Sequence, residues 1–184
     1  LPETLEVCDY LGLVGCKNLI SLPSSLKQVY RLNVSQCESL RSLPEDLLVI
    51  GDLYMEYSGI DRLPENLMVG NGFHASHTDL ETIPNHVRIG GLVDLSYCKK
   101  LSSLPEGWIV NGYLGLAHSW IRELPAHLTV KGNLDLMFTG ISVLPSTLRI
   151  GGELRTYSSG IIEVPYLDQD VPLDLEKQIW QGSG

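Results

Sequence analysis

The chain has 184 residues, of which 43% are hydrophobic and 19% charged, so it is neither a disordered nor a fibrous sequence. Its formal net charge is −9 and its pI about 4.9, which argues against binding nucleic acid or an anionic membrane surface, because both need a basic face. No run of about 18 apolar residues is present, so no membrane insertion is expected. The chain opens inside a repeat motif without a Sec signal peptide, and we expect it to be a fragment of a longer protein.

A Leu-Pro dipeptide, or a close variant of it, recurs along the chain at intervals of 20 or 21 residues. The first residues of these dipeptides are Leu1, Leu22, Leu43, Leu63, Ile83, Leu104, Leu124, Leu144 and Val164. Such regular spacing predicts a solenoid, in which each repeat buries its inner face against the next. We expect eight repeats over residues 1–163 and a C-terminal cap and tail over residues 164–184.

Each repeat also has a fixed internal pattern when the Leu of Leu-Pro is counted as position 0. Positions 4, 10 and 12 are apolar, apart from Thr156 at position 12 of the last repeat, and position 6 is usually aliphatic. The pair at positions 10 and 12 has the period of a strand, of about four residues, whereas the segment around each Leu-Pro is too short for a helix. The predicted fold is therefore a β-dominated repeat solenoid. Short parallel strands would line its concave surface, and its convex side would be irregular or extended.

Position 15 carries a small side chain in every repeat: Cys16, Cys37, Ser58, Thr78, Cys98, Ser119, Thr139 and Ser159. We expect these side chains to hydrogen-bond inward-facing backbone groups of the loops, with the three cysteines as buried, reduced thiols. Cys16 and Cys37 fall on adjacent repeats, yet parallel side chains that point the same way disfavour a disulfide between them. Cys8 is placed just before a strand, and no CxxC pair is present to predict a zinc site.

Neighbours of core positions in a strand point the opposite way, so positions 9, 11 and 13 are predicted to face the concave surface, with position 14 at its margin. Tyrosine and histidine gather in these columns, and position 14 carries five rings in succession. Aromatic residues are enriched in protein interfaces. The alternative is that the rings of position 14 only stack on one another. The predicted partner-binding residues are Tyr54, Tyr57, His74, His77, Asp94, Tyr97, Tyr113, His118, Asp135, Phe138, Arg155 and Tyr157.

No catalytic residue, metal site or cofactor is predicted. His74 and His77 lie three residues apart near Asp94, but convergence of three ligands is not indicated by this pattern. The many serine and aspartate residues are not accompanied by a GxSxG motif, and an open solenoid face excludes water poorly. The mixture of acids and rings on the concave surface instead predicts a protein partner with some basic character.

The repeat pattern resembles the leucine-rich repeat, LxxLxLxxNxL followed by LPxxL, over residues 1–163. The repeat length and the Leu-Pro element are most similar to the short bacterial class, which includes the repeat domains of type III secreted effectors such as the IpaH-type ubiquitin ligases. This chain departs from the family at position 15, where Cys, Ser or Thr replaces Asn. The resemblance implies a virulence-associated effector module that is secreted into the host-cell cytoplasm and binds host proteins; the other expected location is the bacterial cytoplasm.

Two other interpretations remain open at this point. The chain could be the substrate-recognition domain of a larger enzyme such as an effector E3 ubiquitin ligase. The catalytic domain would then lie outside this chain, because the family's Cys-x-Asp motif is absent and Cys8-Asp9 has no intervening residue. A third interpretation is a purely structural or phage-associated repeat protein, for which changes in the ring column would alter stability but no binding.

Overall fold

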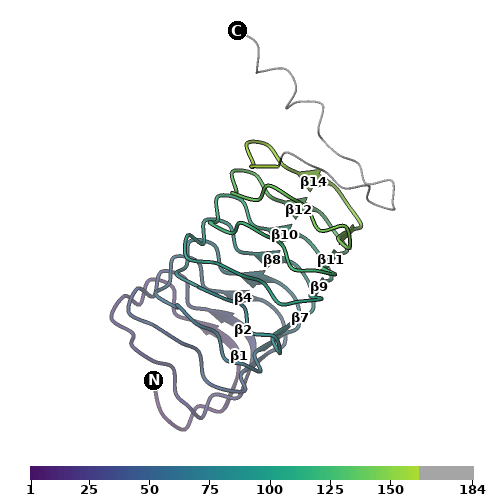
Figure 1. The fold of residues 1–184 in the computed structure, drawn as a ribbon. Helices are drawn as coiled ribbons and strands as arrows, with labels where there is room; N and C mark the ends of the chain where they lie inside the picture. Colours follow the sequence, from purple (N-terminus) through teal and green to yellow (C-terminus); the bar gives the residue numbers. More distant parts are fainter. Residues whose placement is uncertain (162–184) are drawn as a thin grey trace.

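The computed structural model describes residues 1–161, so the predicted cap and tail, 164–184, lie outside the described residues. Figure 1 shows the turns of the chain stacked in parallel as a solenoid. The described residues contain strands and turns but no helix, as predicted for a β-dominated solenoid. Consequently, no helix in this part of the chain is long and apolar enough to cross a membrane.

The main row of strands lies at repeat positions 10 and 11 and is parallel throughout. It consists of β1 (Val7–Gly12), β2 (Gln28–Asn33), β4 (Leu53–Tyr54), β6 (Phe73–His74), β8 (Val93–Asp94), β10 (Leu114–Gly115), β12 (Leu134–Asp135) and β14 (Leu154–Arg155). Each strand pairs in register with the same position of the next repeat; Leu114, for example, is opposite Val93 on one side and Leu134 on the other. We call the outward surface of this row, at positions 9, 11 and 13, the main-sheet face. It is the surface that the sequence predicts to be concave.

A second row of strands lies at positions 5 and 6, beside the main row (Figure 1). It consists of β3 (Leu48–Val49), β5 (Met68–Val69) and β7 (Arg88–Ile89), followed by the separate group β9 (Ile109–Val110), β11 (Thr129–Val130) and β13 (Arg149–Ile150). The long strand β2 joins the two rows, because its start pairs with β3 and its end with β4. The prediction of one strand of about four residues per repeat was therefore wrong, since most repeats contain two strands of two residues.

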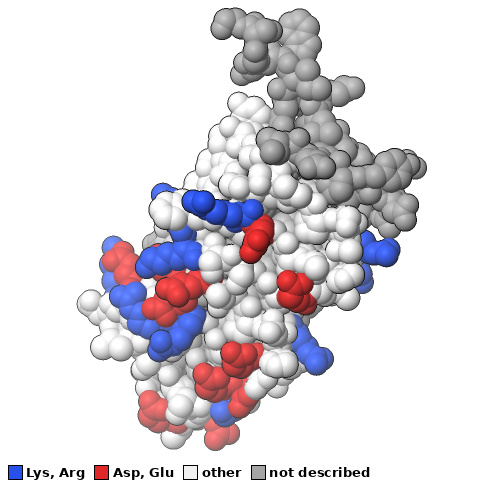
Figure 2. Space-filling view, viewed as in Figure 1, with Lys and Arg blue, Asp and Glu red and all other residues white. Residues whose placement is uncertain are grey.

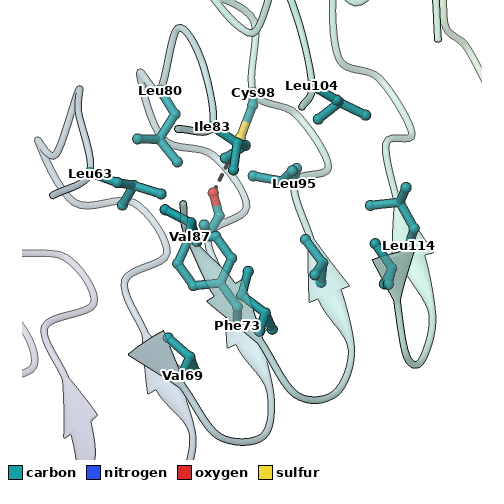
Figure 3. Packing of buried hydrophobic residues seen from close by; sticks show 14 of the residues in the cluster. Leu63, Val69, Phe73, Leu80, Ile83, Val87, Leu95, Cys98, Leu104 and Leu114 are labelled. Atoms are coloured by element: carbon teal, nitrogen blue, oxygen red, sulfur yellow. Dashed lines mark hydrogen bonds between the residues drawn. The ribbon is translucent and has the colours of Figure 1, made fainter. Parts of the chain in front are cut away.

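The core consists of the apolar side chains that every repeat directs inward. In the fourth repeat, Leu67, Val69, Phe73 and Ala75 are all buried. Phe73 is among the largest fully buried side chains and lies among aliphatic residues of neighbouring repeats, as Figure 3 shows. Full burial of one such side chain stabilises the fold by about 1.5–3 kcal/mol. The same contribution from every repeat is what holds a stack of two-residue strands together.

Most side chains of position 15 donate a hydrogen bond to a main-chain carbonyl of position 12. Thr78 Oγ1 donates to the Ala75 carbonyl of its own repeat at 2.8 Å, whereas Cys98 Sγ donates to the same carbonyl from the following repeat at 3.2 Å. Figure 3 shows the Cys98 thiol within the buried cluster. Cys37 makes the equivalent bond to Leu13 at 3.0 Å. The predicted hydrogen bonding is thus confirmed for these three side chains but not for Ser58, whose buried Oγ has no hydrogen-bond partner.

Cys16 was wrongly predicted to be buried. Cys37 and Cys98 are buried, but Cys16 is exposed. All four cysteines are free thiols, and burial raises the pKa of Cys98 and of Cys37. Cys8 was placed just before a strand but lies within β1.

Close packing between repeats explains several glycines in the turn that joins the two rows. A Cβ atom at Gly90 would lie 2.1 Å from the Gly70 carbonyl oxygen, while the Gly90 N–H donates to Val69 at 2.8 Å. The backbone of Gly90 is therefore held against its neighbour without room for a side chain.

We predict that Gly90→Ala destabilises the fold by about 1–3 kcal/mol, because the repeats must separate to admit the methyl group. Gly140→Ala is the matched control, since its Cβ would meet Arg122 Cγ at an ordinary 3.6 Å. In urea denaturation, the free energy of unfolding of the control should differ from that of the wild type by no more than about 0.5 kcal/mol. Equal stability of the two variants would contradict this account of Gly90.

Candidate functional site

Five aromatic side chains at position 14 form one continuous stack, which we call the ring ladder: Tyr57, His77, Tyr97, His118 and Phe138. Successive ring centroids lie 4.2–4.4 Å apart, and the planes differ by only 8–13°. Tyr157 meets Phe138 edge-on at 5.4 Å and ends the run. The structure thus brings together six of the twelve predicted binding residues, in one line along the solenoid.

The backbone of the ring ladder is left-handed. All five residues have φ between 55° and 61°, a region that glycine favours, and Gly15 occupies the equivalent place in the first repeat. Hydrogen bonds between repeats fix this conformation: the N–H of Tyr97 donates to the carbonyl of Ala117 at 2.8 Å, and that of His118 to Met137 at 2.9 Å. The conformation therefore belongs to the repeat and not to the ring that occupies it.

At position 14, the free energy gained by ring stacking and the free energy lost to backbone strain are of similar size. A left-handed conformation costs about 1–2 kcal/mol for a residue with a side chain, whereas an aromatic pair contributes about 0.5–1.5 kcal/mol beyond burial of its area. Large parts of the rings also stay in contact with solvent: Tyr57 is 54% exposed and Phe138 is 43% exposed. Stability alone therefore gives little preference for rings over glycine at position 14.

Tyr54 and His74 form a second, shorter stack on the main-sheet face. Their centroids lie 4.5 Å apart with planes 10° apart, on the paired strands β4 and β6. His74 and His77 thus belong to two different stacks, which keeps them from converging on one point. Among residues 1–161, no group of three or more His, Cys, Asp or Glu side chains is placed to hold a metal ion.

Tyr113 lies flat over a glycine. A Cβ atom at Gly115 would come within 2.6 Å of the Tyr113 hydroxyl and 2.9 Å of Asp94 Oδ1, so the missing side chain makes room for the ring. His74 covers Gly72 in the same way. The sequence prediction missed this pairing, although the pattern of a tyrosine two residues before a glycine occurs both at Tyr10 and at Tyr113.

Two of the predicted binding residues each use one carboxylate oxygen to accept a hydrogen bond from a backbone N–H nearby in the chain. Asp94 Oδ1 accepts the Ser96 N–H, and Asp135 Oδ1 accepts the Met137 N–H, each at 3.0 Å. These bonds turn the chain out of the strand toward the ring ladder. Asp135 is only 4% exposed, and its second oxygen is 3.5 Å from the Tyr113 hydroxyl, so a partner would meet it through Tyr113.

The main-sheet face is acidic. Positions 9, 11 and 13 carry five acids, Asp52, Glu56, Asp94, Asp135 and Glu153, against two bases, Arg31 and Arg155, which gives a formal charge of −3. Both bases are paired locally, Arg31 with Asp52 at 3.2 Å and Arg155 with Glu153 at 2.8 Å. The carboxylates that are not in these ion pairs, together with the rings, should attract a partner surface with cationic groups more than one with anionic groups.

Comparison of the chain with protein-family models, curated proteins and solved structures finds no match. Its site is therefore interpreted from its own geometry.

A pair of substitutions at Tyr97 separates strain from stacking. We expect Tyr97→Ala to lose about 1–3 kcal/mol of stability, because it keeps the left-handed strain and removes two ring contacts. Tyr97→Gly relieves the strain and should be the more stable of the two by about 1 kcal/mol. Thermal or urea unfolding measures both, and an alanine variant as stable as the glycine variant would contradict a strained ladder.

The stability of the fold should depend on the ionisation of Tyr113. Burial, and then the charges of Asp135 and Asp94, raise its pKa from 10.0 to about 12. The neutral phenol is thus favoured in the folded state, and this contribution is fully present below pH 10 and is lost as the pH rises through about 12. Urea midpoints across this range should fall more steeply for the wild type than for Tyr113→Phe. Parallel pH profiles would refute the assignment.

Proposed function

We propose that this chain is a protein-binding module of the leucine-rich-repeat class, which holds its partner on the main-sheet face and the ring ladder. The observation that carries the proposal is the line of stacked rings, of which Tyr57 is 54%, Tyr97 38% and Phe138 43% exposed. Tyrosine at the centre of an interface adds large contact area at low entropic cost. A binding role gives these rings a benefit that stacking between repeats does not supply.

The partner that fits this surface has both apolar and basic groups. The acids of the main-sheet face, formally −3, favour cationic side chains, and the ring ladder beside them offers aromatic area. Tyr54 and His74 extend the aromatic area onto the sheet itself. The resemblance of the repeats to those of bacterial effectors supports a host protein as this partner, with the chain acting in the host-cell cytoplasm by binding and not by catalysis.

Affinity capture from eukaryotic lysate tests the proposal with one test variant and one control variant. The test variant carries Tyr54→Ala, Tyr57→Asn and Tyr97→Asn, where asparagine is chosen because it tolerates the left-handed backbone. The control carries Met68→Ser and Ile109→Ser, two exposed residues of the second row. We expect a protein held by the wild type and the control to be lost, by about tenfold or more, from the test variant.

Salt dependence tests the charge of the partner separately. Capture should weaken as NaCl rises from about 0.05 to 0.5 M, because screening removes the attraction between acids and bases. Equal capture by all three chains would overturn the proposed surface, whereas salt-independent capture would overturn only the basic character of the partner.

A further inference from the structure

A hollow opens between the loops of the fifth and sixth repeats. The fifth repeat has 21 residues, and its additional residue forms a turn in which the Leu101 N–H donates to the Cys98 carbonyl at 3.2 Å. The sixth repeat has 20 residues and has only Trp120 between the buried residues Ser119 and Ile121. The two loops therefore do not superpose, and a cavity of about 650 Å³ lies at the step between them.

Trp120 forms one wall of this hollow and is 69% exposed. Its place in the other 20-residue repeats is taken by Gly59, Asp79, Gly140 and Gly160, so stacking of the solenoid does not require an indole there. Gly140, on the next repeat, offers no side chain to cover the ring. A large aromatic surface in a hollow is the kind of feature that marks a binding site in an otherwise polar surface.

Charged side chains of both signs surround the indole. Lys99 and Arg122 line the hollow together with Glu81 and Glu123. Lys100 also lines the hollow, but its charge is paired with the Asp79 carboxylate at 2.9 Å, whereas none of the other four side chains forms an ion pair within residues 1–161. Figure 2 shows acidic and basic side chains intermingled where they gather on one side of the solenoid. Such a balance favours neither a polyanion nor a polycation.

We propose that this hollow binds a neutral saccharide. The C–H face of a pyranose ring would lie against the indole, whose face carries the negative end of its quadrupole. Hydroxyl groups both donate and accept hydrogen bonds. They would donate to the carboxylates of Glu81 and Glu123 and accept from Lys99 and Arg122, and such charge-assisted bonds are the stronger kind. A neutral polyol thus uses both signs of charge, whereas a phosphate is repelled by the carboxylates and a basic peptide by Lys99 and Arg122.

Indole N–H signals in ¹⁵N-labelled protein test this site, because tryptophan occurs only three times in the chain. The probes are maltose, cellobiose and N,N′-diacetylchitobiose, each added up to about 100 mM, since an open site of this kind binds in the millimolar range. Trp120→Phe identifies the Trp120 signal by its disappearance. We expect a saturable shift of that signal with at least one disaccharide, and no shift at the buried Trp108.

Variants then separate a built site from weak adsorption. Trp120→Ala should abolish the shifts of backbone signals in the loops around Lys99 and Arg122, and Glu123→Gln should weaken binding by about threefold or more. The proposal is overturned by any of three results: no saturable shift with the three disaccharides, unchanged loop shifts in Trp120→Ala, or stronger shifts with sodium sulfate or arginine than with the disaccharides. None of these results bears on the ring ladder, so this site and the proposed protein binding can fail separately.

Discussion

The structure depends on main-chain hydrogen bonds that join each repeat to the next in strict register. Leu114 lies opposite Leu134, and Asp135 opposite Arg155, so each strand residue meets the same position of the neighbouring repeats. A parallel in-register stack converts a repeated residue type into a continuous line in space. The core, the hydrogen-bonding column at position 15 and the ring ladder are three results of this one constraint.

The same register explains why an unfavourable backbone conformation can be kept through five aromatic residues. The N–H of each position 14 is taken by a carbonyl of the next repeat, as for Tyr97 and Ala117, so the left-handed turn is fixed before any side chain is chosen. Once the turn is fixed, rings in this column stand one repeat apart, which is close to the distance at which aromatic planes stack. The ladder is therefore an outcome of the backbone and not its cause.

Most of the fold could be predicted from the sequence because the repeat pattern is governed by burial, which spacing alone reveals. The core positions, the direction of the strands and the columns of the ring ladder followed from period and alternation. The second row of strands did not, since Met68–Val69 and Arg88–Ile89 are too short to show a period. The exposure of Cys16 and the hollow beside Trp120 also escaped prediction, because both depend on how neighbouring repeats pack and not on the residue itself.

The geometry of the ladder also decides how its rings can act. The inner rings have both faces covered at 4.2–4.4 Å, so a cation of a partner cannot lie on them and a partner can contact only their edges. Basic groups of the partner must then be met by the carboxylates of the main-sheet face, and its apolar groups by the ladder. Two neighbouring surfaces with different chemistry fix the orientation of a partner as well as its affinity. Trp120 differs from the ladder in this respect, because no ring among residues 1–161 stacks on it, and this is why stacking with a ligand is assigned to the hollow and edge contacts to the ladder.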